Sequence, residues 1–167
     1  AAGAYTNRNL GFSVVVANPD TIYASATNSN SDPNAMDPVT RGGVVIEYSR
    51  QGASWVNTRA IYDPDTKRFN QFGWDLDFED PLLVIGAPGD TKLDGGEMGD
   101  TKKVGRTFLY DVSTGTIERY SSSPFIEDDR FGFAVGISQG TVAVGEPRDR
   151  SSESTDTGSV HVFGSRF

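Results

Sequence analysis

The chain repeats one pattern three times, and this repetition constrains its fold more than any other feature. Leu10-Gly11-Phe12 recurs as Phe72-Gly73-Trp74 and again as Phe131-Gly132-Phe133, with the glycines 62 and 59 residues apart. A β-branched run, a small-residue triplet and a glycine that opens an alternating strand follow each copy. Because the units are similar and regularly spaced, each is predicted to be one supersecondary block that buries its apolar faces by stacking on its neighbours.

The second half of each repeat is also recognisable. The small-residue triplets are Ser25-Ala26-Thr27, Gly86-Ala87-Pro88 and Gly145-Glu146-Pro147, and the strand-opening glycines are Gly43, Gly105 and Gly158. Together these motifs resemble the FG-GAP repeat, the blade of integrin-α-type β-propellers, over nearly the whole chain. The resemblance implies an all-β fold of three propeller blades in a single domain, 1–167. The blades are expected at about 10–60, 72–121 and 131–167.

Local patterns predict the strands. Apolar and β-branched runs bounded by Pro, Gly and Asn turns are typical of short antiparallel strands. The expected strands are 12–17, 21–25, 44–48, 54–60, 82–86, 107–110, 116–121, 133–137, 141–145 and 160–163. The third repeat has no readable fourth strand, and we find no amphipathic helix. The segment 4–9 is a candidate for an outer strand of a neighbouring blade.

The motif residues have a structural interpretation. A glycine beside a large aromatic lets two backbones approach closely and adopts unusual dihedral angles, while the aromatic fills the space between blades. The alternative for the aromatics is a binding platform. Proline after the second strand fixes the chain where no ladder donor is needed. The residues expected in these roles are Gly11, Phe12, Phe72, Gly73, Trp74, Gly86, Pro88, Phe131, Gly132, Phe133, Gly145 and Pro147.

Three blades are too few for an ordinary ring, since propellers close with about four to eight blades. We therefore expect a partial propeller or arc that is completed by a partner protein, another copy or missing chain. The terminal blade faces, patterned like buried ones, are the expected contact surfaces. The resemblance implies a non-enzymatic protein-interaction, scaffold or adhesion module, in an extracellular or organelle-lumen setting.

Composition excludes several partners. The formal net charge of −8 disfavours a nucleic-acid backbone, whose contacts depend on Lys and Arg, and an anionic membrane surface. No run is long and apolar enough to span a bilayer, so no direct membrane insertion is expected. The absence of cysteine removes disulfides, thiol catalysis and thiolate metal sites.

No cofactor is expected, and the calcium loop of integrin-type repeats is not present. That loop has the spacing Asp-x-Asp-x-Asp-Gly, whereas the three corresponding turns here are short and poor in carboxylates. A calcium site formed by Asp90, Asp94 and Asp100 in a glycine-rich loop is the alternative. Asp75, Asp77 and Glu79 alternate along one strand, which indicates a solvated face or, alternatively, a cation site.

Two further functions are left open by the residues. Exposed aromatics of propellers can stack on sugar rings, and Trp55 and Tyr62 lie outside the motif cores, so a carbohydrate-binding module is the alternative to a scaffold. An enzyme that uses the acidic residues of the second repeat is a third hypothesis. His161, the only histidine, alternates with two valines in a predicted strand and is expected to be structural rather than catalytic.

Overall fold

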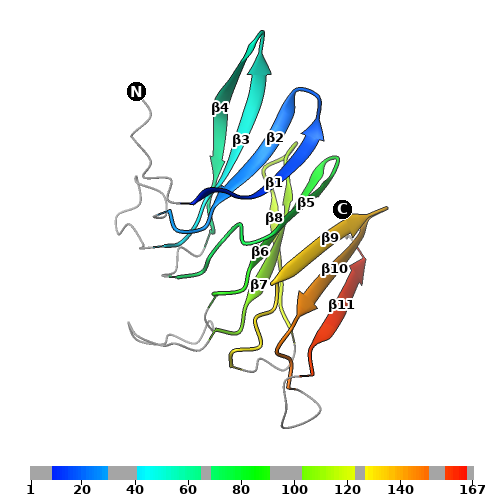
Figure 1. Cartoon of the computed structure of the whole chain (residues 1–167). Helices are drawn as coiled ribbons and strands as arrows, with labels where there is room; N and C mark the ends of the chain where they lie inside the picture. Colours follow the sequence, from blue (N-terminus) through cyan, green and yellow to red (C-terminus); the bar gives the residue numbers. More distant parts are fainter. Residues whose placement is uncertain are drawn as a thin grey trace.

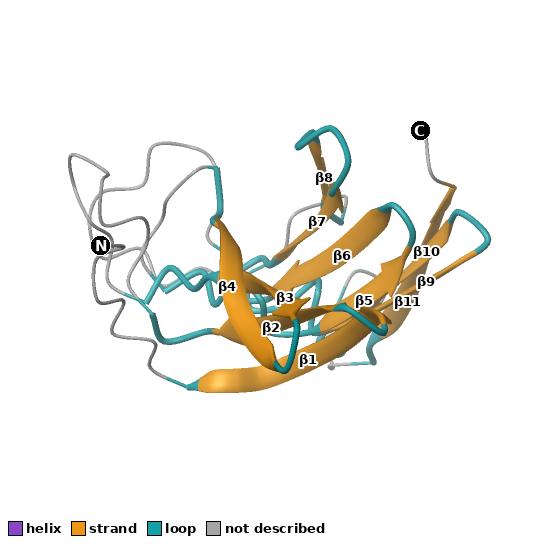
Figure 2. Ribbon diagram, turned by 90° about the horizontal axis from the view of Figure 1, so that it is seen from above, coloured by secondary structure: helices purple, strands orange, loops and turns teal. Residues whose placement is uncertain are grey.

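The three repeats fold into three separate antiparallel sheets, none of them closed (Figure 1). The computed structural model describes residues 9–29, 41–64, 69–90, 103–122, 127–150 and 157–164. Within these ranges the chain forms only strands, turns and loops, as Figure 2 also shows. The predicted all-β class and the propeller-blade arrangement are therefore confirmed. The candidate outer strand at 4–9 lies outside the described residues, apart from Asn9, which is in a turn.

Each sheet is one blade whose strands run in sequence order, hairpin by hairpin. Blade 1 contains β1 (Leu10–Asn18), β2 (Thr21–Ala26), β3 (Val45–Gln51) and β4 (Ser54–Ile61). Blade 2 contains β5 (Leu76–Glu79), β6 (Leu82–Ala87), β7 (Arg106–Asp111) and β8 (Ile117–Tyr120). Blade 3 contains β9 (Ala134–Ser138), β10 (Thr141–Glu146) and β11 (Ser159–Gly164). The first strands β1, β5 and β9 pack side by side along the row of blades.

The first hairpin of blade 3 shows how local sequence sets the register. Ser138 pairs with Thr141, which leaves Gln139 and Gly140 as a two-residue loop. Both loop residues have positive φ, 49° and 69°, and this is the backbone twist that two-residue hairpins prefer. The hairpin therefore places the apolar side chains of β9 and β10 on one face of the sheet.

Two cores hold the blades together, and both lie between blades. Blades 1 and 2 enclose a cluster that includes Tyr23, Val45, Phe72 and Phe108. Blades 2 and 3 enclose another cluster in which Phe131 packs with valines and leucines of both sheets. Every residue of β6 is buried, because the middle blade is covered on both faces. This explains why its sequence is continuously apolar rather than alternating.

The outer faces of the terminal blades carry exposed apolar side chains, although Ile46 on the outer face of blade 1 is buried in a cluster with Ala26 and Val44. We call the face toward the following blade the leading face and the opposite one the trailing face. On the trailing face of blade 1, Val14 and Val16 are 53% and 68% exposed. On the leading face of blade 3, Val160 and Val162 are 72% and 66% exposed. Among the described residues, no helix is long and apolar enough to cross a membrane.

Candidate functional site at the blade joints

Blade 3 is attached to blade 2 by a close backbone contact that only glycine permits. The Phe131 N–H donates to the carbonyl of Val104 at 3.1 Å, in a parallel bridge between Gly105 and Phe131. A Cβ on Gly105 would overlap the backbone of Phe131, and a Cβ on Gly86 would overlap the carbonyl oxygen of Gly132. We call this contact, between the glycines of one blade and the Phe-Gly of the next, a blade joint.

Blades 1 and 2 form a second joint of the same kind. The Phe72 N–H donates to the carbonyl of Gly42 at 3.1 Å, and a Cβ on Gly43 would lie 2.7 Å from the Phe72 nitrogen. Here Ser25 replaces the first glycine of the small-residue triplet. A Cβ on Gly73 would lie 2.6 Å from the Ser25 Cβ, so the glycine of the incoming blade keeps the approach close. This joint therefore forms although the triplet of the first repeat differs.

The motif aromatics divide into two groups. Phe72 and Phe131 are fully buried at the joints, as expected for residues that fill the space between blades. The rings of Phe12, Trp74 and Phe133 instead form a ladder, with centroids 4.7 Å apart at the first step and 5.4 Å apart at the second. Phe12 and Phe133 are exposed at the ends of this ladder, so it can be extended in both directions.

Three acidic side chains, one just before β5 and two within it, bind the backbone of blade 3. Oδ2 of Asp75 accepts from the Val135 N–H at 2.9 Å, and Oδ2 of Asp77 accepts from the Ile137 N–H at 2.7 Å. The two carboxylate oxygens of Glu79 accept from the N–H groups of Gln139 and Gly140, at 2.6 and 2.8 Å.

These carboxylates act as a substitute sheet partner for β9. Antiparallel neighbours would satisfy strand N–H groups with carbonyls, whereas here side chains one blade away supply the oxygens. The hydrogen bonds from Gly140 and then Gln139 lower the pKa of Glu79. Neither sequence interpretation of Asp75, Asp77 and Glu79, a solvated face or a cation site, included this role.

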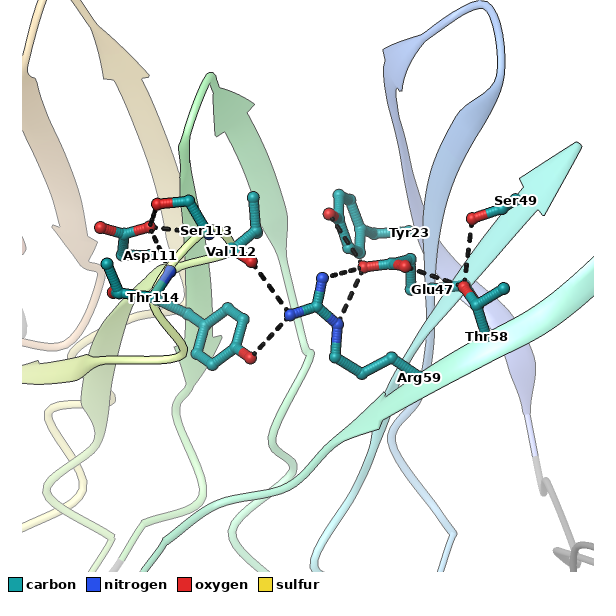
Figure 3. Close-up of polar contacts among 10 residues, drawn as sticks. Tyr23, Glu47, Ser49, Thr58, Arg59, Asp111, Val112, Ser113 and Thr114 are labelled. Carbon is teal, nitrogen blue, oxygen red and sulfur yellow. Dashed lines mark hydrogen bonds and ion pairs between the residues drawn. The ribbon is translucent and has the colours of Figure 1, made fainter.

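The side chain of Arg59, on β4, connects blades 1 and 2 (Figure 3). Nε and Nη2 of Arg59 donate to one oxygen of Glu47 at 3.0 and 2.5 Å. Nη1 of Arg59 crosses to blade 2 and donates to the Tyr110 hydroxyl at 3.2 Å and to the Val112 carbonyl at 3.0 Å. Burial, followed by the charge of Glu47, raises the pKa of Tyr23 to about 12. The buried Glu47 is thus neutralised by a cation that also binds the next blade.

A compact acidic cluster lies at the end of β10. Nε2 of His161 lies 2.6 Å from Oε2 of Glu146, and the cluster also contains Asp149. One ligand-type atom of each residue lies within 4.8 Å of the others. Burial, and then the charges of Glu146 and Asp149, raise the pKa of nearby Asp129 to about 6. The sequence signal for this cluster was Glu146, which stands where the second repeat has Ala87 in its Gly-Ala-Pro triplet.

The alternative calcium residues are only partly described. Asp90 is buried and pairs with Arg106, whose Nη1 lies 3.2 Å from an Asp90 carboxylate oxygen. The guanidinium therefore already supplies positive charge to this carboxylate. Asp94 and Asp100 lie outside the described residues.

The two aromatics considered for sugar binding are not neighbours. Trp55 is exposed near the start of β4, whereas Tyr62 follows its last residue and packs on the cluster of Ala26, Val44 and Ile46. With a rise of about 3.4 Å per residue, the strand separates them by roughly 24 Å. They do not form one platform, so the carbohydrate alternative rests on Trp55.

The fold and its joints define a protein made of stacked propeller blades. A family model described as the FG-GAP repeat matches residues 126–163, which contain blade 3 except for its last residue, Gly164. The match confirms that the chain carries an FG-GAP repeat, as the motifs indicated. No curated protein matches the chain.

Proposed function

We propose that this chain is a non-enzymatic protein-interaction module, a scaffold subunit that contacts other protein through its two terminal blade faces. The observation that carries the proposal is the exposed apolar surface on the trailing face of blade 1 and the leading face of blade 3. Val16 and Val160 are its most exposed valines, at 68% and 72%.

Blade 2 shows how exposed the same positions are when a neighbouring blade is present. Leu76 of blade 2 occupies the position of Val14 and is buried, because blade 1 covers it. Leu109 of blade 2 occupies the position of Val162 and is fully buried under blade 3. The same positions are thus buried wherever a neighbouring blade is present. Burying a large apolar side chain contributes roughly 1.5 to 3 kcal/mol, which favours a protein cover on each terminal face.

The FG-GAP repeat supports the same conclusion at a coarser level. Such repeats are typical of protein-binding modules that are generally not enzymes, and residues 126–163 match a repeat of this kind. Adhesion or scaffolding, outside the cytosol or in an organelle lumen, is the specific role that the resemblance favours. Fold alone does not determine function, so the proposal depends on the exposed faces.

Cysteine protection tests whether the faces are covered. The chain contains no cysteine, so Val16→Cys, Val162→Cys and the control Ser54→Cys, at the exposed start of β4, each introduce a single reactive thiol. Each variant is expressed in cells and labelled with a maleimide, in a native extract and as a dilute purified chain.

We expect both face thiols to be protected in the extract and reactive in the purified chain, while the control reacts in both. Equal labelling of all three variants in the extract would contradict the proposal. Protection by any protein, including another copy of the chain, would support it.

A further inference from the structure

Blade 3 has an open hollow on its leading face. Its volume is about 590 Å³, and Phe133, Gly145, Pro147, Gly158 and Val160 are among the residues that line it. These two glycines correspond to glycines of blade 2. Gly145 pairs with Val160 as Gly86 pairs with Thr107, and Gly158 and Gly105 each lie two residues before that pair.

In blade 2 the two equivalent glycines face the Phe-Gly of the next blade. Within the part of the chain that the structure describes, the nearest atoms to those of blade 3 belong to blade 3 itself. The nearest atom to a Cβ on Gly145 is the Ala134 Cβ at 3.4 Å, and the nearest to a Cβ on Gly158 is the Pro147 oxygen at 3.2 Å. The hollow, which we call the socket, therefore has the form of half a blade joint.

Blade 1 presents the other half of a joint. Gly11 has a φ of 86°, matching 85° at Gly73 and 86° at Gly132, the glycines that enter the two formed joints. Among the described residues, and apart from Gly11 and its two chain neighbours, no atom lies within 4 Å of the place that a Gly11 Cβ would take, whereas Gly73 and Gly132 are tightly enclosed. Leu10-Gly11-Phe12, which we call the plug, thus has the backbone shape of an inserted segment, and the space beside its glycine is open although the Phe12 ring packs on Trp74.

We propose that the socket of one chain binds the plug of a second copy, so that two copies associate head to tail. The inference rests on the proposed interaction function and names its partner. Leu10 would take the place that Phe131 takes in blade 3, and Gly11 would approach Gly145 as Gly132 approaches Gly86.

Two further features continue across this contact. Phe133 and Phe12 are the open ends of the aromatic ladder, so placing one on the other adds a further step to a series that already has two. Val160 and Val162 of one copy would cover the exposed Val14 and Val16 of the other. The surface is continuous with two joints that already exist in the chain, and this favours another copy over an unrelated protein.

The contact uses different patches on its two sides, so it is heterologous and must close to give a finite assembly. Two copies of three blades give six, which is within the range of about four to eight blades of closed propellers. A closed pair contains two identical joints and leaves neither socket nor plug free.

Complementation between variants tests the direction of the contact. Gly145→Ala blocks the socket, and Leu10→Asp places a charge in the plug. Val56→Asp, an exposed valine on β4, is the matched charge control. Association of each purified chain is measured by light scattering and native mass spectrometry over a range of concentrations.

We expect the wild-type chain and Val56→Asp to form pairs, and each of the other two variants alone to dissociate about 10- to 100-fold more readily. An equimolar mixture of Gly145→Ala and Leu10→Asp should regain association through one joint, in which an unaltered socket meets an unaltered plug, while the second joint carries both changes. An interface with two identical patches would not be rescued by mixing.

The outcomes that overturn the inference are specific. A wild-type chain that stays monomeric, a Gly145→Ala variant that pairs normally, or a mixture without rescue would each refute it. If the purified chain is monomeric while both face thiols are protected in extracts, the proposed function survives with a different partner. The fold of each variant is checked by melting of the dilute monomer. If Gly145→Ala fails this check, Val160→Asp on the same exposed face replaces it.

Discussion

Replacing Gly86 by alanine should destabilise the chain, while the equivalent change at Gly145 should not. A Cβ on Gly86 would overlap the Gly132 carbonyl oxygen, which is backbone and cannot rotate away. Blade 3 must then shift by a substantial part of an ångström, and overpacking of this kind costs about 1 to 3 kcal/mol. Neither glycine has a positive φ, so the comparison is free of backbone strain.

Gly145→Ala is expected to increase the free energy of unfolding rather than decrease it. The new methyl would meet only the Ala134 Cβ at an ordinary 3.4 Å, and the unfolded chain would lose conformational freedom. Such changes stabilise by about 0.4 to 1 kcal/mol where the backbone is compatible.

Urea unfolding of the dilute monomers measures both values, and melting should show a decrease of about 4 to 8 °C for a loss of 2 kcal/mol in a chain of this size. If Gly86→Ala unfolds at the wild-type urea concentration, blades 2 and 3 do not meet through this glycine. The joint geometry, and the inference built on it, would then be wrong.

Three other changes test the polar contacts between and within the blades. Asp77→Leu should lower the free energy of unfolding by about 1 to 3 kcal/mol, because the Ile137 N–H loses its acceptor. Asp77→Asn, which keeps an acceptor oxygen, should lower it less. Equal urea midpoints for Asp77→Leu and the wild type would contradict this role. Arg59→Ala should cost about 1 to 3 kcal/mol by leaving the buried Glu47 without its cation, whereas Arg50→Ala, an arginine at the exposed end of β3, should cost under 0.5 kcal/mol in the same urea assay. Asp129 has a pKa raised from 3.8 to about 6, so its ionisation weakens the folded state as pH rises between these values. Asp129→Asn should therefore gain up to about 3 kcal/mol over the wild type at pH 7 and nothing near pH 3, and an equal gain at both pH values would refute this assignment.

The strands were predictable because their signals are local. The expected strand 21–25 is observed as Thr21–Ala26, and the expected strand 141–145 as Thr141–Glu146. Alternation, β-branched runs and turn residues act within a few positions, and the three copies of the motif support one another. The fold class followed from the same repetition.

The polar contacts were not predictable, because their partners are far apart in the chain. Asp77 binds a backbone N–H 60 residues away, and no side-chain pattern shows which N–H groups lack a strand partner. The cluster of Asp129, Glu146, Asp149 and His161 is assembled from two loops and two strands. Its sequence signal, a glutamate within a small-residue triplet, marks an unusual position without naming the residues that it meets.

Association through the proposed joint between copies should not weaken as salt is added, whereas association through ion pairs would. The carboxylates of Asp75, Asp77 and Glu79 that bind blade 3 are replaced in blade 3 itself by Ala134, Gly136 and Ser138, by strand register. The plug brings no charged side chain either, so apolar burial and backbone approach would supply this contact.

Each copy carries a formal net charge of −8, and like charges repel at low ionic strength. Added salt screens this repulsion over a Debye length of about 10 Å at 0.1 M. Association of the purified chain should therefore stay constant or strengthen as sodium chloride is raised, when followed by light scattering. Association that weakens steeply with salt would mean that ion pairs hold the copies together, and the plug would not be the contact.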